Sequence, residues 1–208
     1  MNKTTKNAWE KIFQERGKIF LKPHEDMGKL IKTFRAHGVK KILDLGSGSG
    51  RHVIYFAKNG FLVYGLDNSS SGLAITRKWL SEECLEAKLL EQEMTTTFPF
   101  EDNFFDAIIS IQVIHHANTS NIHKIISEIR RVLKKNGFIF ITVPVFKNQG
   151  TNFKQIEPNT YIPLDGHEKG LPHHYFTKKE LKEFFFNFNI VDLHIDRENH
   201  YCLSAIKL

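Results

Sequence analysis

The sequence predicts a single α/β domain, residues 1–208, in which helices cover both faces of a mostly parallel β-sheet. Apolar runs typical of buried strands alternate with amphipathic segments long enough for crossover helices. The last two apolar runs have only the polar turn 196–200 between them, so we expect an antiparallel hairpin at the end of the chain. A chain of 208 residues is long enough to bury one full core.

Two helices are expected before the sheet, within residues 1–38, as a cap on the domain. Apolar residues from Trp9 to Phe20 mark the first helix. The second has apolar residues at the i, i+3, i+4, i+7 spacing of one helical face from Met27 to Phe34, and Gly38 is expected to stop it.

The remaining elements follow in alternation. Strands are expected over residues 41–45, 61–66, 88–92, 105–111, 138–143, 190–195 and 201–206, and helices over 51–58, 72–83, 122–133 and 178–187. Gly137 is expected to stop the third of these helices, and a capping box from Thr177 to Glu180 starts the last one. Residues 144–176 have no clear pattern and exceed the usual loop length, so we expect an irregular, substrate-facing loop or lid there.

The net charge of +6 is confined to the N-terminal part of the chain. Residues 1–41 carry eleven basic and four acidic residues, whereas the remainder is nearly balanced. Such an excess is more typical of solvated helix faces than of a surface for an anionic partner, and both readings stay open.

Cysteine content and hydropathy favour a cytoplasmic protein with no membrane association. Cys84 and Cys202 are far apart in sequence and are expected to be reduced thiols. No apolar run approaches the ~20 residues of a membrane span, and the N-terminal residues lead into no signal-peptide core.

The stretch ILDLGSGSG, residues 42–50, joins the first strand to a helix and is the strongest candidate for a binding turn. Alternate glycines permit backbone conformations and close approaches that a Cβ would block, and ligands of open α/β sheets lie beyond the C-terminal strand ends. A dinucleotide turn reads G-x-G-x-x-G, but Arg51 stands where its third glycine would be. Asp44 would repel a pyrophosphate and suits a ligand that carries an ammonium group.

Beyond this turn, the landmarks from about Trp9 to Leu208 resemble those of class I S-adenosylmethionine-dependent methyltransferases. ILDLGSGSG resembles the first motif of that family, and Asp67 in VYGLDNS resembles the acid that hydrogen-bonds the ribose hydroxyls. The stretches LLEQEMTTTFPFEDNFFDAIIS, IISIQVIHHA, EIRRVLKKNGFIFITV and PHHYFTKKELKEFF resemble the later landmarks in order. The resemblance implies a three-layer Rossmann-like fold whose seven-stranded, mostly parallel sheet ends in an antiparallel hairpin strand.

The same resemblance implies S-adenosyl-L-methionine as the cofactor and S-adenosyl-L-homocysteine as its product. The residues implied to bind it are Asp44, Gly46, Ser47, Gly48, Gly50, Asp67, Asn68, Glu93, Met94 and Gln112. Glu93 and Met94 depart from the Asp-plus-apolar pair that ordinarily holds adenine. Asp67 alone does not distinguish this cofactor from NAD, and Asp44 also fits a buried, paired acid.

The methyl acceptor is not named by the sequence, but some classes are disfavoured. The stretch QVIHH, residues 112–116, lacks the Asn/Asp-Pro-Pro-aromatic pattern of family members that methylate exocyclic base amines. A small molecule methylated on O, N or S is therefore the first hypothesis. An RNA or protein acceptor that uses the basic N-terminal helices is the second, and a nucleotide-binding oxidoreductase or a non-catalytic cofactor-binding protein is the third.

His116, His173 and His174 are the candidate general bases, because histidine has an unperturbed pKa near neutral. For each of them, a structural hydrogen-bonding role is the competing hypothesis. The spacing of these histidines, with His115 and His123, fits no usual zinc site and lacks cysteine ligands, so no metal is expected. The oligomeric state is left open.

Overall fold

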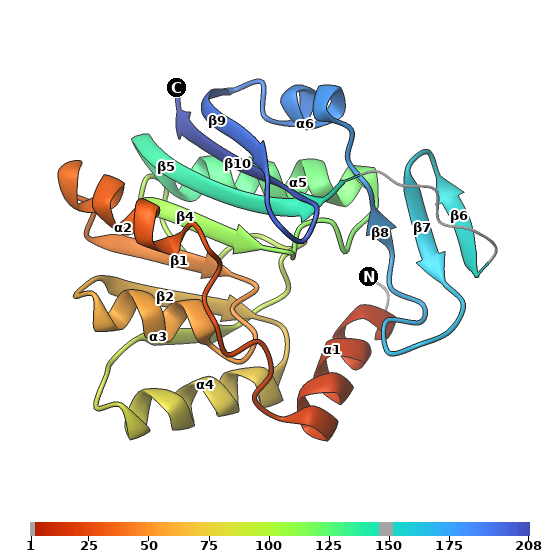
Figure 1. Ribbon diagram of the computed structural model, residues 1–208, viewed down its shortest axis with the longest axis horizontal. Helices are drawn as coiled ribbons and strands as arrows, with labels where there is room; N and C mark the ends of the chain where they lie inside the picture. The colour runs from red at the N-terminus through yellow and green to blue at the C-terminus, as the bar shows by residue number, and fades with distance from the viewer. Residues whose placement is uncertain (1–2, 146–151) are drawn as a thin grey trace.

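The computed structural model describes residues 3–145 and 152–208 and forms a three-layer α/β fold (Figure 1). The strands of the main sheet are β1 (Lys41–Leu45), β2 (Leu62–Asp67), β3 (Lys88–Glu91), β4 (Phe105–Ile111), β5 (Leu133–Pro144), β9 (Phe188–Ile195) and β10 (His200–Lys207). They lie in the order β3-β2-β1-β4-β5-β10-β9. Strands β1 to β5 pair in parallel, and β10 is antiparallel to both of its neighbours. The predicted fold class is confirmed.

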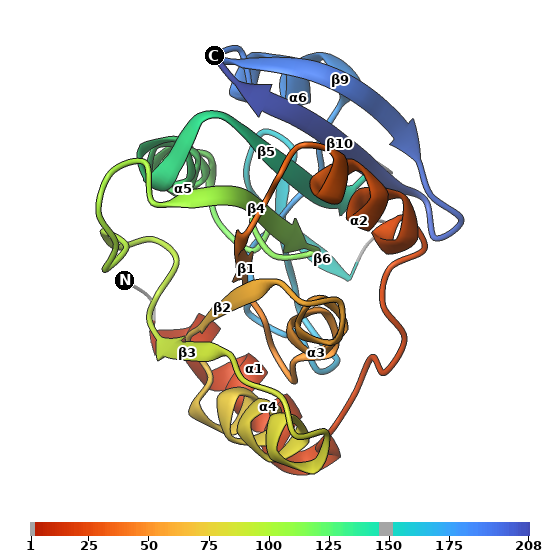
Figure 2. The ribbon, with the colours of Figure 1, turned by 90° about the vertical axis from the view of Figure 1, so that its left-hand side faces the viewer.

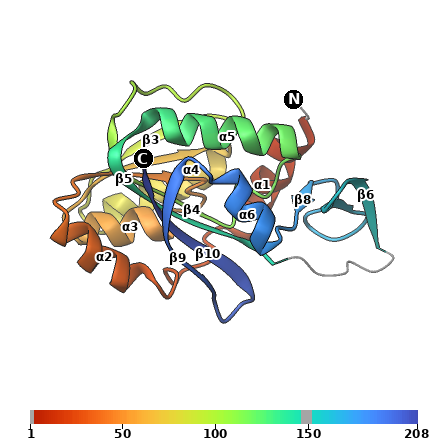
Figure 3. The ribbon, with the colours of Figure 1, turned by 90° about the horizontal axis from the view of Figure 1, so that it is seen from above.

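Helices cover both faces of this sheet (Figure 3). One face is covered by α2 (Met27–Ala36), α3 (Arg51–Lys58) and α4 (Ser70–Glu82), and the other by α5 (Thr119–Val132) and α6 (Lys178–Phe184). The first helix, α1 (Lys3–Arg16), belongs to neither layer and packs against α4 near the C-terminal ends of the strands (Figures 1 and 2).

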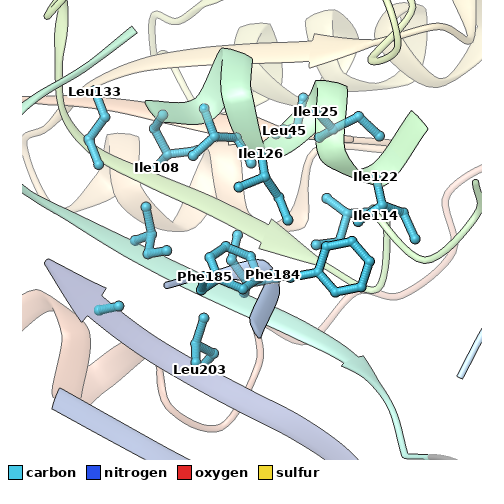
Figure 4. Packing of buried hydrophobic residues seen from close by; sticks show 14 of the residues in the cluster. Leu45, Ile108, Ile114, Ile122, Ile125, Ile126, Leu133, Phe184, Phe185 and Leu203 are labelled. Carbon is cyan, nitrogen blue, oxygen red and sulfur yellow. The ribbon is translucent and has the colours of Figure 1, made fainter. Parts of the chain in front are cut away.

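The two cores follow from the alternation of side chains along the strands. In β1, Leu43 and Leu45 pack on the α5 side and Ile42 on the side of α2 and α3. The buried face of α5 places isoleucine side chains against β4 and β5. Phe184 and Phe185, at the C-terminal end of α6, pack against the same core (Figure 4). Both faces are buried because every parallel strand carries apolar residues on each side.

Capping side chains set the starts of three helices. The side chain of Ser69 accepts a hydrogen bond from the backbone N–H of Gly72 at the start of α4, and Asn118 caps α5 in the same way. The predicted capping box of Thr177 and Glu180 is present at α6.

Three helix ends differ from their predicted positions. The first helix ends at Arg16, and Phe20 lies beyond it, exposed and in a left-handed backbone conformation. The helix expected to stop at Gly137 ends at Val132, where the chain already enters β5. Helix α6 is shorter than predicted because Phe188 begins a strand that pairs with β10.

The prediction of an irregular loop over residues 144–176 is wrong for much of the segment. A three-stranded antiparallel sheet occupies it, built from β6 (Phe153–Glu157), β7 (Thr160–Pro163) and β8 (His173–His174). The N–H of Phe176 donates to the carbonyl of Pro144 at 3.3 Å, so the segment leaves and rejoins the domain at one place. Residues 146–151 lie outside the described part of the chain.

None of the described helices combines the length and the apolar character that a bilayer crossing requires. Both cysteines are free; Cys84 is exposed and Cys202 is buried.

Candidate active site

A cavity of about 460 Å³ lies at the C-terminal ends of β1, β2 and β4, between these strand ends, α1 and the small sheet. Seven of the ten residues predicted to bind the cofactor line it: Gly46, Ser47, Gly48, Asp67, Asn68, Met94 and Gln112. Of the three predicted bases, His116 and His173 line it and His174 does not. The other three predicted residues, Asp44, Gly50 and Glu93, are not part of the cavity wall.

The glycine turn after β1 owes its glycines to the packing of the protein itself. Gly46, Gly48 and Gly50 have φ values of 76°, 53° and 90°, in the left-handed region that favours glycine. A Cβ on Gly46 would lie 2.3 Å from Val113 Cγ2, and one on Gly50 would lie 2.6 Å from Thr76 Cγ2. The close approach inferred from the sequence is real, but at these two positions the neighbour is a protein side chain.

Asp67 ends β2 and holds the glycine turn in place. Its Oδ2 accepts a hydrogen bond from the backbone N–H of Gly48 at 2.7 Å, and its Oδ1 accepts one from Ser69 at 2.8 Å. Burial raises the pKa of Asp67, while these backbone hydrogen bonds act in the opposite direction. Each carboxylate oxygen can accept a further hydrogen bond, so the group can bind two donors from the cavity.

Asp44 lies within the sheet behind the turn and is almost fully buried. Burial raises its pKa to about 7, against the opposing charge of Arg51, and its Oδ2 has no hydrogen-bond partner in the described chain. A buried carboxyl group with a free oxygen next to the cavity wall would be stabilised in its ionised form by a cation.

Asn68 and Glu93 form one unit across the ends of β2 and β3. The Asn68 side-chain amide donates to Glu93 Oε2 at 3.0 Å. Asn68 and Met94 line the cavity, whereas Glu93 is positioned to orient the amide. The structure thus shows Glu93 in contact with a wall residue and not on the wall itself, and its role toward a cofactor stays a prediction.

Gln112 follows β4 in a strained conformation, with a φ of 60° that is uncommon for a non-glycine residue. Its backbone N–H donates to the carbonyl of Thr142 at 3.1 Å, and its side-chain amide donates to Thr142 Oγ1 at 3.1 Å. Such strain persists only where surrounding contacts enforce it, and it is concentrated at binding sites.

Helix α1 covers the cavity and is anchored through Glu10. The carboxylate of Glu10 accepts hydrogen bonds from Ser69, Ser70 and Ser71 at the N-terminus of α4, the shortest being 2.6 Å from Ser71 Oγ. Burial alone would raise the pKa of Glu10, but these hydrogen bonds outweigh it and lower the pKa to about 2. The anchored helix places Trp9 on the cavity wall.

Three histidine rings lie together on the cavity wall. His115 and His116 follow β4, and His173 comes from β8 of the small sheet. The ring centroids of His116 and His173 are 4.7 Å apart, and Trp9 lies 5.6 Å from His116. All three histidines are buried.

Burial sets the protonation of the pair after β4. It lowers the pKa of His116 to about 3, with the nearby His173 acting in the same direction, and it lowers the pKa of His115 well below its usual value. Both rings are therefore neutral near pH 7. A pKa near 3 makes His116 a weak base, since general bases work best with a pKa close to the operating pH.

His173 is held by two contacts, one through each ring nitrogen. Nδ1 lies 3.0 Å from the Leu171 carbonyl, and Nε2 lies 3.0 Å from Glu168 Oε2. The hydrogen bond with His173 lowers the pKa of Glu168. Glu168 and His173 thus form a polar pair on the cavity wall.

His174 points away from these groups. Its Nδ1 lies 2.8 Å from Thr160 Oγ1 and its Nε2 lies 3.2 Å from Glu180 Oε1, in a fully buried position against Phe184. These contacts tie β7, β8 and α6 together. The position favours the structural role that was its competing hypothesis.

Sequence reasoning missed several wall residues. Trp9 and Phe13 were assigned to the face of a helix, and Glu168, Glu198 and His200 belong to segments without a motif. The aromatic residues Trp9 and Phe13 on the N-terminal helix do not by themselves indicate a cavity wall, since such a stripe is equally typical of core packing.

Comparisons with known proteins agree with this geometry. Residues 43–141 match the family model described as a methyltransferase domain. YcgJ, an uncharacterised methyltransferase of Bacillus subtilis strain 168, is 29% identical over 128 residues, which cover 62% of this chain and 47% of YcgJ. The chain spans about half the length of the curated relatives it matches first. Other relatives are named as methyltransferases of ubiquinone biosynthesis, tRNA and rRNA.

Two solved structures share the fold. A SAM-dependent methyltransferase of Methanosarcina mazei superimposes with a TM-score of 0.72 at 21% identity, over 84% of this chain and 97% of that chain. The 1,6-didemethyltoxoflavin-N1-methyltransferase of Burkholderia thailandensis, solved with 1,6-didemethyltoxoflavin and S-adenosylhomocysteine bound, gives a TM-score of 0.72 at 17% identity, over 98% and 87% of the two chains. The methyltransferase-domain model thus matches just under half of this chain, residues 43–141, and the chain shares its fold with these two solved structures.

Proposed function

We propose that this protein is an enzyme that transfers the methyl group of S-adenosylmethionine to an O, N or S atom of a small molecule. The observation that carries the proposal is the continuity of one cavity. Its wall runs from the glycine turn and Asp67, which the family resemblance assigns to the cofactor, to the histidines of the opposite end.

The residues of the cofactor end fit the group that the domain type implies. Asp67 has two carboxylate oxygens with acceptor capacity left, which suits the paired hydroxyls of a ribose. Asp44, buried behind the wall, favours an ammonium group in the cavity through its charge, and Asn68, Met94 and Gln112 supply amide and apolar contacts around a base. Bound there, the cofactor supplies a methyl group on a sulfonium sulfur for in-line transfer to the acceptor.

The protein's part in this reaction is alignment, exclusion of water and removal of a proton. Trp9 and Phe13 on the anchored helix α1 cover the cavity and restrict access of water. Nε2 of His173, next to Glu168, is placed to take a proton from the acceptor. His116 contributes a neutral ring that can contact and orient the same molecule.

The size and cover of the cavity favour a small acceptor. About 460 Å³ lies within the range of cavities that bind small molecules. The basic residues of the N-terminal part also have partners elsewhere in the fold: Lys18 lies 3.9 Å from Glu82 and stacks on Trp79, and Lys29 lies 3.1 Å from Asp192. These contacts support a structural reading of the charge excess.

Calorimetry with S-adenosylhomocysteine, NAD and NADP tests the cofactor half of the proposal. We expect binding of S-adenosylhomocysteine alone, and binding of NAD alone would refute the assignment. A panel of small thiols, phenols and amines, each incubated with protein and cofactor and analysed by mass spectrometry for a gain of one methyl group, tests the acceptor half. Affinity for RNA that falls steeply with salt, together with methylation of that RNA, would instead support a nucleic-acid acceptor.

A further inference from the structure

Two ring nitrogens at the histidine end of the cavity have no partner in the described chain. Nδ1 of His115 and Nδ1 of His116 are both buried and make no hydrogen bond. Together with His173, each of these residues offers a nitrogen within 4.8 Å of the other two. A buried polar atom without a partner is costly, so a group that binds these nitrogens would stabilise the arrangement.

The contacts of the rings fix where their lone pairs are. A carbonyl only accepts, so Nδ1 of His173 must donate its hydrogen to Leu171, and a neutral ring then has its lone pair on Nε2. Nε2 lies 3.0 Å from Glu168 Oε2, which also only accepts when ionised. Two acceptors at this distance need a positive species next to both, which is either a proton or a metal ion.

His116 shows the same pattern. One of its nitrogens hydrogen-bonds to the backbone of Pro172, where the only polar group is a carbonyl. Because Nδ1 has no partner, Nε2 is the nitrogen that donates, and the lone pair is left on Nδ1. Histidines that bind metals almost always donate their second ring N–H to a carbonyl or carboxylate in this way.

We propose that His115, His116 and His173, together with Glu168, bind one divalent transition-metal ion on the cavity wall. Three imidazoles and a carboxylate suit Zn²⁺, Co²⁺ or Ni²⁺, whereas Mg²⁺ and Ca²⁺ prefer oxygen ligands alone. The sequence predicted no metal because the residues lie some fifty positions apart, and only the small sheet brings β8 against the end of β4.

The ion would also narrow the class of acceptor, and this step rests on the proposed function. A thiol, hydroxyl or amine that binds a divalent cation releases its proton to solvent more readily. Nε2 of His173 would then be a metal ligand and no longer a base. The proposed acceptor is therefore a small molecule that coordinates metal through the atom to be methylated.

The test measures metal binding by the full-length, tag-free protein in the absence of cofactor and acceptor. After treatment with a chelator, the protein is titrated with Zn²⁺ in a calorimeter and with Co²⁺ in a spectrophotometer, with Mg²⁺ as the comparison ion. We expect one Zn²⁺ per chain, visible Co²⁺ absorption bands and no binding of Mg²⁺. His115→Gln and His116→Gln should each weaken Zn²⁺ binding at least ~10-fold.

His167→Gln is the matched control, because this exposed histidine lies on the same segment as Glu168 without joining the cluster. Equal affinity in the control and in both cluster variants would overturn the proposal, as would the absence of stoichiometric Zn²⁺ binding at micromolar concentrations. S-adenosylhomocysteine binding is measured on every variant as a test of folding. If the wild type binds Zn²⁺ but not S-adenosylhomocysteine, the metal site stands and the proposed function fails.

Discussion

The two ends of the cavity are built in different ways. The end proposed to bind the cofactor comes from one short stretch and from the tips of adjacent parallel strands, and backbone groups fix it: the N–H of Gly48 donates to Asp67, and the N–H of Gln112 donates to Thr142. The end proposed to bind the acceptor is assembled from side chains of distant segments, with Trp9 and His173 each contacting His116. A binding region that is fixed by backbone geometry requires particular residues close together in the sequence, so it can be recognised from a local pattern. A region formed by tertiary contacts between distant segments shows no such pattern.

The largest expected effect tests the backbone-defined end. Gly48→Val should lower the affinity for S-adenosylhomocysteine by more than about 100-fold, because a β-branched residue at a φ of 53° is strained and its Cβ would lie 3.0 Å from Phe13. Gly60→Val, which also has a positive φ but no neighbour within 4 Å of its Cβ, serves as the control for strain alone. Calorimetry on both variants decides, and equal losses would show that strain, not crowding of the cavity, is responsible.

The acceptor end should lose turnover and keep the cofactor. His173→Ala is expected to lower kcat about 100-fold, because the residue acts on the acceptor's proton either as the base or as a ligand of the proposed metal ion; 100-fold is the lower end of the range for removal of a general base. The affinity for S-adenosylhomocysteine should change little. His174→Ala should mainly lower the melting temperature, since it removes buried contacts with Thr160 and Glu180. The reverse outcome, full activity in His173→Ala and loss in His174→Ala, would show that we have assigned the two neighbours wrongly.

Asp67→Ala should weaken cofactor binding from roughly tenfold, if one hydrogen bond is lost, to more than a hundredfold, if two are lost. Each hydrogen bond to a charged group contributes about 1.5–3 kcal/mol, and every 1.4 kcal/mol corresponds to roughly tenfold in affinity. The measurement is a titration with S-adenosylhomocysteine, and Asp165→Ala, in an exposed position off the cavity wall, is the control. Wild-type affinity in Asp67→Ala would place the ligand elsewhere.

The smallest effect concerns the acid behind the turn. With its pKa raised to about 7 by burial, Asp44 is mostly protonated at pH 6 and mostly ionised at pH 8. A ligand ammonium favours the ionised form, so affinity for S-adenosylhomocysteine should rise about tenfold from pH 6 to pH 8. Asp44→Asn should flatten this profile. A wild-type profile that is already flat over this range would mean that Asp44 does not sense the ligand.

The fold was largely predictable because strand and helix periods alternate clearly from β1 to β5. Seven of the ten residues predicted to bind a cofactor line the cavity, and whether they bind one stays a prediction, whereas the reason for the glycines was not predicted. The glycine pattern of the turn predicts space for a ligand, whereas in the structure Val113 and Thr76 occupy the space next to Gly46 and Gly50. Only the three-dimensional structure shows which side chain occupies the space that a Cβ on each glycine would fill.

The small sheet escaped prediction for a different reason. Its strands β6, β7 and β8 are five, four and two residues long, and β6 and β7 are only partly buried. Strands this short show little alternation of apolar and polar residues. Glu168 has no motif around it, and its role exists only because His173 lies 3.0 Å away. Likewise, nothing in the sequence around His173 and His174 indicates that His173 lines the cavity whereas His174 packs against α6.

The backbone hydrogen bond between Phe176 and Pro144 has a consequence for which changes of sequence the protein can accept. The inserted segment leaves and rejoins the domain at one point, and it also contacts α5 and α6 through Glu157, Asn159 and His174. Loop-closure entropy rises only slowly with length, so an insertion next to the exposed residues Asp165 and Gly166 should be tolerated without moving β5 or α6. The small sheet thus adds His173 and Glu168 to the cavity wall from outside the main sheet.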